Sequence, residues 1–196
     1  SLVKRGEYLF AALGSKGFEV FDIANVDNKD FSERIVTAPV SPLGQRTYVR
    51  SRYATAVALP VNMPIAPGRK SLPENQEQGI HPIYHYAYFT DREEGLILVN
   101  VDTLSDRDPT NNFLKRALTF NPEGKLTGAY NLAIAGNTLY IVVQRGLIGG
   151  LIVIDISDPM KPNILAEMAS FIKPSSVTIQ FRYAFVTDNE GLKIID

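Results

Sequence analysis

The chain has 196 residues, of which 45% are hydrophobic and 21% charged, and its formal net charge is −1. This composition is typical of a globular domain and excludes a disordered tail, which would have few apolar residues and a high net charge. The sequence contains no cysteine, which excludes a disulfide scaffold, a zinc-thiolate centre, an iron–sulfur cluster and covalently attached haem within it. The charge argues against nucleic acid as a partner, and the apolar runs are too short to predict a membrane span.

Taken in chain order, the apolar segments form a repeat. Four stretches share the pattern glycine, apolar, any residue, apolar, apolar, Asp or Asn: residues 17–22, 95–100, 150–155 and 191–196. A second apolar segment precedes each of them, at residues 8–10, 86–89, 138–141 and 183–186. Their β-branched and aromatic residues predict strand pairs. We expect the glycine to supply the positive φ of a tight hairpin, and the closing Asp or Asn to fix the next turn.

Two further strands complete each unit. A strand of small residues comes before the second, third and fourth hairpins, at residues 54–59, 131–135 and 175–179. Another strand follows the first three hairpins, at residues 32–38, 113–120 and 163–170. Four-stranded antiparallel units that recur along a chain predict an all-β fold, the β-propeller. The alternative is a β-sandwich built from repetitive hairpins.

The expected propeller segment has units at residues 1–38, 39–120, 121–170 and 171–196. The first unit is predicted to lack its small-residue strand and the last to lack its fourth strand, which gives a partial propeller of about three and a half to four blades. The chain has no initiator methionine, and both ends look cut within the repeat. We therefore expect a segment of a longer protein, in which more chain or another molecule completes the ring.

The stretch Gly150-Leu151-Ile152-Val153-Ile154-Asp155-Ile156-Ser157-Asp158-Pro159 resembles the signature of LVIVD-repeat proteins. The other three units match it with departures, such as Phe18 in the first unit and Asn100 in the second. The resemblance implies a bacterial or archaeal β-propeller, commonly secreted or on the cell surface (the periplasm being the alternative), that serves as a scaffold or binding module. Because relatives can accompany multihaem segments, it also implies a haem protein as a candidate partner.

The second unit carries two long connections. Residues 60–83, with five prolines, join its first two strands, and residues 102–112 join its last two. In a meandering blade these two connections emerge on the same side, so we expect them to lie together and to form a surface for binding or assembly. The residues expected to make contacts there are Arg69, Lys70, Glu74, Glu77, Asp106 and Arg107.

Charge is distributed unevenly around this unit. Residues 34–73 contain six basic and no acidic residues, whereas residues 74–108 contain eight acidic and two basic ones. These blocks either neutralise each other or steer a partner. Tyr48, Arg50 and Arg52 alternate along the sequence, so we expect one face of a strand to present them as a small interaction surface.

Signals for chemistry are weak. His81 and His85 are the only histidines, and no pattern nearby supplies further metal ligands. Three acidic segments are candidate calcium sites: Asp91 to Glu94, Asp188 to Glu190, and the group Asp106, Asp108 and Asn111. For the first two, solvated turn charges are the simpler interpretation. No nucleophile motif or phosphate loop occurs, so we assign no catalytic, cofactor or metal residue.

These observations predict a non-enzymatic extracellular or cell-surface scaffold that binds a protein partner or assembles with itself. Two alternatives remain open. One is an accessory domain of an extracellular multihaem electron-transfer assembly. The other is a propeller hydrolase, a lactonase or glycan-cleaving enzyme, with its site in the central channel.

Overall fold

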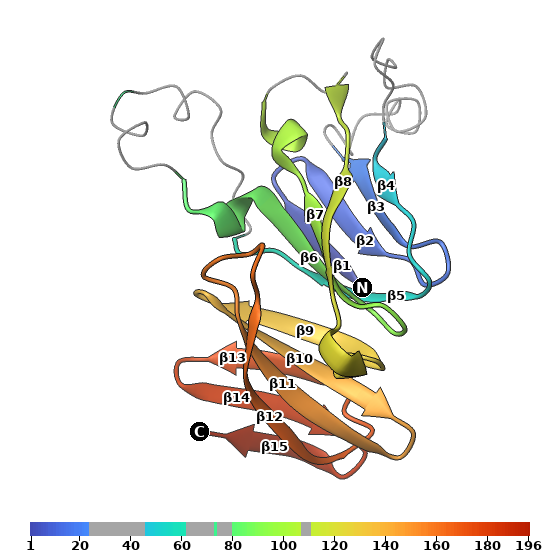
Figure 1. Ribbon diagram of the computed structural model, residues 1–196, viewed down its shortest axis with the longest axis vertical. Coiled ribbons are helices and arrows are strands. Elements are labelled where there is room, and N and C mark those ends of the chain that lie inside the picture. Colours follow the sequence, from blue (N-terminus) through green and yellow to red (C-terminus); the bar gives the residue numbers. More distant parts are fainter. Residues whose placement is uncertain (24–45, 62–72, 74–79, 107–110) are drawn as a thin grey trace.

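The computed structural model describes residues 1–23, 46–61, 73, 80–106 and 111–196, which form four antiparallel sheets in chain order (Figure 1). Each sheet is a meander in which sequential strands pair. Blade one comprises β1 (Leu2–Arg5), β2 (Tyr8–Ala12), β3 (Phe18–Asp22) and β4 (Tyr48–Val49), and blade two comprises β5 (Ala54–Ala58), β6 (Tyr86–Asp91), β7 (Gly95–Asn100) and β8 (Lys115–Phe120). Blade three comprises β9 (Ala129–Ala135), β10 (Thr138–Arg145), β11 (Ile148–Asp155) and β12 (Asn163–Ile172), and blade four comprises β13 (Ser176–Gln180), β14 (Tyr183–Asp188) and β15 (Gly191–Ile195). The fold is a four-bladed β-propeller, as predicted.

Blade one differs from the prediction at both ends. Its innermost strand was expected to be missing, but β1 pairs with β2 from Leu2 opposite Ala11 to Arg5 opposite Tyr8. The expected fourth strand at residues 32–38 lies outside the described residues. The strand that pairs with β3 is the two-residue β4, so blade one extends to Val49, past the unit end expected at residue 38.

In blade three, Gly150 does not have the role predicted for it, which was to supply the positive φ of the hairpin. Gly17, Gly95 and Gly191 have positive φ values of 86°, 85° and 127°, as a hairpin glycine should. Gly150 lies inside β11, and the positive φ of this hairpin belongs to Gly146 at 73°. A Cβ on Gly150 would lie 2.9 Å from the carbonyl oxygen of Met168, so this glycine permits a close approach of β12.

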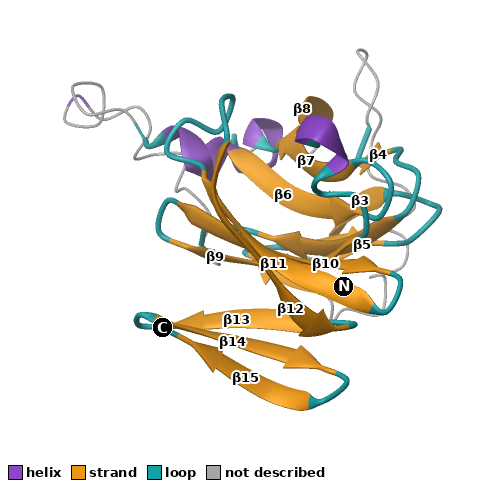
Figure 2. Ribbon diagram, turned by 60° about the horizontal axis from the view of Figure 1, so that its bottom comes forward, coloured by secondary structure: helices purple, strands orange, loops and turns teal. Residues whose placement is uncertain are grey.

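The inner strands β1, β5, β9 and β13 follow one another through the fold, and successive blades pack face on face (Figure 2). A separate apolar core fills each joint between neighbouring blades. Phe18 and Phe89 lie in the first core, Leu96 and Ile152 in the second, and Val142 with other residues in the third. Each blade is therefore stabilised mainly by its neighbours.

The described helices are short 3-10 turns in the connections: η1 (Pro82–His85), η2 (Asp102–Ser105) and η4 (Pro122–Gly124). Among the described residues, none of them has the length and apolar character required to cross a membrane.

Candidate interaction surfaces

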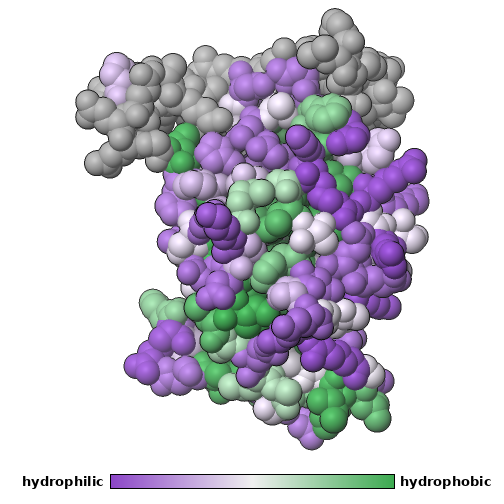
Figure 3. All heavy atoms as spheres, viewed as in Figure 1, coloured by the Kyte–Doolittle hydropathy of each residue, from purple (hydrophilic) through white to green (hydrophobic). Residues whose placement is uncertain are grey.

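The face of blade four that points away from blade three is open. We define this open face by Thr178, Phe185, Leu192 and Ile194, which alternate with the buried Val177 and its neighbours along β13, β14 and β15. Leu192 and Ile194 are each 61% exposed. Figure 2 shows blade four as the outermost layer, and Figure 3 shows hydrophobic residues gathered over the half of the molecule that holds blades three and four.

The repeat shows what these two positions normally do. Leu192 and Ile194 occupy the second and fourth places of the hairpin motif. In blade two the same places hold Leu96 and Leu98, which are fully buried in the core shared with blade three. In blade one they hold Phe18 and Val20, buried in the core shared with blade two. The open face therefore has the side chains of a blade-to-blade joint without a further blade against it among the described residues.

The edge of blade four is also free. Blades one to three have a fourth strand outside the third, whereas the sheet of blade four, within the described residues, ends at β15. An edge strand leaves one row of backbone N–H and C=O groups available for pairing.

One turn of blade four combines exposure with backbone strain. Phe181 is 91% exposed, and its φ is 55°. The corresponding turns of blades one and three place Gly6 and Gly136 in the same position, with φ values of 59° and 57°. A left-handed backbone is unfavourable for a bulky side chain, so this phenylalanine departs from the pattern of its sister turns.

The β5–β6 connection ends beside the start of the β7–β8 connection. The Nδ1 atom of His85 lies 2.5 Å from Oδ1 of Asp102, and the N–H of Val101 donates to the carbonyl of His85 at 3.0 Å. The side-chain amide of Asn100 also donates to Asp102 at 3.0 Å. Sequence reasoning missed this histidine–carboxylate pair, because only the register of β6 and β7 brings residues 17 positions apart together.

A buried cation lies at the same end of blade one. Arg5 is 6% exposed and packs over the ring of Phe10 at 5.4 Å, and one of its terminal nitrogens is buried without a hydrogen-bond partner. Burial lowers the pKa of Arg5 to about 10, and the nearby charge of Asp102 opposes this shift.

Most of the residues expected to make contacts in the long connections lie outside the part of the chain that the structure describes. Arg69, Lys70, Glu74, Glu77 and Arg107 lie outside the described residues. Asp106 is described: its Oδ2 atom accepts a hydrogen bond from Nδ2 of Asn111 at 2.8 Å. The third residue of this calcium candidate, Asp108, lies outside the described residues.

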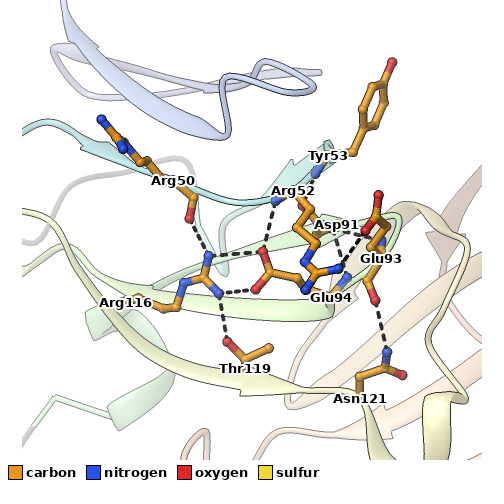
Figure 4. Close-up of polar contacts among 9 residues, drawn as sticks. All are labelled: Arg50, Arg52, Tyr53, Asp91, Glu93, Glu94, Arg116, Thr119 and Asn121. Atoms are coloured by element: carbon orange, nitrogen blue, oxygen red, sulfur yellow. Dashed lines mark hydrogen bonds and ion pairs between the residues drawn. The ribbon is translucent and has the colours of Figure 1, made fainter.

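On the opposite side of blade two, a carboxylate ties the β4–β5 connection to the β6–β7 turn (Figure 4). Oδ1 of Asp91 accepts the N–H groups of Glu93 and Glu94, each at 2.9 Å, and Oδ2 accepts the N–H of Tyr53 at 2.5 Å. Burial alone would raise the pKa of Asp91, but the hydrogen bonds from the N–H groups of Glu94, Glu93 and Tyr53, together with the nearby side chain of Ser51, outweigh it and hold this pKa below its usual range.

The interpretation of this turn as a solvated charge cluster is therefore wrong for Asp91, which is fully buried. Asp188 repeats the arrangement in blade four. It accepts the N–H groups of Glu190 at 2.9 Å and Ile172 at 3.1 Å, and its side chain pairs with Lys193 at 2.7 Å. Both aspartates serve as internal acceptors that fix turns. Among the described residues, no group of three or more acidic or histidine side chains is arranged to hold a metal ion.

The predicted arginine–tyrosine surface has a different form from the one expected. Tyr48 lies in β4, but Arg50 and Arg52 lie in the irregular connection after it, so the three residues do not share a strand face. Arg52 forms an exposed ion pair with Glu93 at 3.0 Å. The side chain of Arg50 points away from the turn, and its carbonyl accepts a hydrogen bond from Arg116 (Figure 4).

Arg116, which sequence reasoning did not select, is the centre of this polar network. It pairs with Glu94 at 2.5 Å and donates to the hydroxyl of Thr119 at 3.1 Å. The N–H of Arg52 also donates to Glu94, at 3.0 Å. Arg116 therefore joins β8 to the connection that enters blade two, and no local sequence signal distinguishes it from any other strand arginine.

Comparison with known proteins agrees with this architecture. The family model described as the LVIVD repeat matches residues 128–169 and 173–196, which cover blade three up to Ala169 in β12 and all of blade four. No curated protein matches the chain in sequence.

Two computationally designed proteins have similar structures. The Ika4 protein has a TM-score of 0.58 and 10% sequence identity over 99% of this chain and 88% of its own. The Ika8 protein has a TM-score of 0.58 and 11% identity over 98% of this chain and 44% of its own. At these identities the likeness concerns the fold alone. Taken together, the repeat match and the blade geometry show that blades three and four of this β-propeller are built from LVIVD repeats.

Proposed function

We propose that this chain is a non-enzymatic scaffold and protein-interaction module whose open face on blade four binds the sheet of another propeller blade. The observation that carries the proposal is the exposure of Leu192 and Ile194 at places that blades one and two bury completely or almost completely. Burying a leucine or isoleucine side chain is worth about 1.5–3 kcal/mol, so a sheet that covers both would gain substantial free energy.

The repeat also indicates the chemistry of the partner. The third and fifth places of the motif face the preceding blade: Ile97 and Val99 of blade two are fully buried in the core shared with blade one. In blade one the same places hold Glu19 and Phe21, which are half-buried. A second copy of this chain offers this side of blade one, where Phe21 supplies an apolar ring and Glu19 a charge, and we propose self-association through blades four and one.

Sedimentation velocity across a wide concentration series tests this proposal. We expect reversible self-association of the wild-type chain, and a shift towards the monomer in the variants Leu192→Glu and Ile194→Glu. Met160→Glu is the matched control, because Met160 is 43% exposed but lies in the β11–β12 connection, away from the open face. Circular dichroism confirms that each variant is folded. A wild-type chain that stays monomeric at every concentration contradicts the proposal.

A further inference from the structure

A small basic cleft lies between the outer strands of blades one and two. It encloses about 410 Å³ and is lined by Arg46, Tyr48, Val49, Arg50 and Arg116. This volume lies within the range of small-ligand sites, about 300–1,000 Å³. Three of its five lining residues are arginines, and none is acidic. The cleft is separate from the open face of blade four, so a ligand bound in it would not depend on the proposed self-association.

The charge of two of these arginines has no counter-ion among the described residues. Arg116 is neutralised by Glu94. Arg46 bonds to a neutral acceptor, the carbonyl of Leu114, through Nε at 3.2 Å and one terminal nitrogen at 2.9 Å. The Arg50 guanidinium makes no hydrogen bond or ion pair within the described part of the chain, and Figure 4 shows it directed away from Glu94. The cleft therefore carries two uncompensated positive charges.

The cleft is held in place before any ligand arrives. Arg46 stacks over the ring of Phe113 at 4.5 Å, and its backbone bridges to the same residue in parallel register. Arg116 fixes the backbone of Arg50 through its carbonyl. Groups that are already ordered lose less entropy on binding, so this arrangement favours affinity. Tyr48, which is 44% exposed, lines the cleft with its aromatic ring and a hydroxyl that can donate a hydrogen bond.

We propose that this cleft binds a carboxylate carried by an acidic peptide segment. The planar guanidinium fork matches a carboxylate with two parallel hydrogen bonds. Inorganic phosphate is the competing ligand, because the same fork also binds phosphate oxygens, and it is therefore one arm of the test below. Exposed charges of this kind are screened by salt, so binding weakens as ionic strength rises.

Isothermal titration calorimetry of the whole chain at low salt tests the proposal with three probes: a short polyglutamate peptide, a polyglutamine peptide of equal length, and inorganic phosphate. We expect saturable binding of polyglutamate alone, with a dissociation constant of about 1 mM or below. Arg50→Gln should weaken it about tenfold, and Arg50→Lys should weaken it less, because lysine keeps the charge but loses the fork.

Arg145→Gln is the matched control. It removes the same charge from an exposed arginine in blade three, whose side chain donates to the carbonyl of Lys125. This variant should bind polyglutamate as the wild type does. Equal losses in Arg50→Gln and Arg145→Gln would show that binding depends only on net charge and would overturn the proposal. Tighter binding of phosphate than of polyglutamate would overturn the choice of a carboxylate.

Discussion

The ring of Phe18 in blade one stacks on the ring of Phe89 in blade two, with centroids 5.0 Å apart and an angle of 4° between the planes. Both rings are fully buried, and Phe10 adds a third ring 6.2 Å from Phe18. Phe18 comes directly after the hairpin glycine of its motif, where blade two has Leu96. Phe18, which stands where the repeat motif has leucine, is thus the residue that packs blade one against blade two.

Replacing this ring tests how much the joint contributes. Phe18→Ala should lower the free energy of unfolding by about 3–5 kcal/mol, since it leaves a cavity between two blades. Phe18→Leu should cost less, because leucine fills part of the space. Leu147→Ala removes a side chain that is 69% exposed and should change stability by no more than about 0.5 kcal/mol. Urea denaturation measures all three, and a small effect of Phe18→Ala would contradict this role.

Asp91 should make stability depend on acid pH. Its pKa is lower in the folded chain than in the unfolded chain, where an aspartate has a pKa of about 3.9. The stabilisation is therefore complete above that value and is lost as the pH falls through the folded pKa. Asp91→Asn should lower stability at neutral pH by about 1–3 kcal/mol.

The difference between wild type and Asp91→Asn should shrink on acidification, which thermal unfolding from neutral to acid pH can track. Glu123→Gln, a change at an exposed turn residue, is the control and should behave as the wild type does. Parallel pH profiles for wild type and Asp91→Asn would show that this carboxylate does not fix the turn.

Gly128 and Gly136 both have a positive φ, but only Gly128 is in close contact with another strand. Alanine substitutions at the two positions therefore distinguish the cost of backbone strain from the cost of a steric clash. A Cβ on Gly128 would lie 2.1 Å from the carbonyl oxygen of Gln144, whereas one on Gly136 would meet nothing within 4 Å. Gly136→Ala should cost about 1 kcal/mol, the cost of a left-handed backbone. Gly128→Ala should cost roughly 3 kcal/mol or more, because the N–H of Gln144 donates to Gly128 at 2.8 Å and the two strands would have to separate. Equal costs would contradict the predicted close approach.

Phe181→Gly should stabilise the chain. Glycine adopts a φ of 55° without strain, and the side chain of Phe181 is 91% exposed, so little packing is lost. We expect a gain of about 1 kcal/mol in the free energy of unfolding, measured by chemical denaturation. A loss of stability would mean that the ring makes contacts that outweigh the strain of its backbone.

The sequence predicted the hairpins well because their signal is local. Residues 86–89 and 95–100 fall in β6 and β7, and the closing Asn100 accepts the N–H of Asp102 as expected. The strands β1 and β4 were missed for different reasons. The first carries Lys4 and Arg5 where small residues were expected, and the second is only two residues long and is defined by its pairing with Phe18 and Glu19.

The polar sites were harder to predict because they depend on contacts across blades. Asp91 lies in an acidic run that indicates a surface turn, and it is buried only because the connection through Tyr53 folds over it. The cleft of Arg46, Arg50 and Arg116 likewise joins residues of two blades. The predicted extracellular location, haem partner and long-connection contacts stay predictions.

Blade four is packed from one side, through the joint that includes Val177 and Val186, and this has a consequence for motion. In a chain of stacked modules, a module with one neighbour opens at a lower free energy than a module with two. Amide hydrogens of β14 and β15 should therefore exchange with solvent faster than those of β10 and β11. Local stability would therefore fall from blade three to blade four. The difference would become smaller when another sheet covers the open face of blade four.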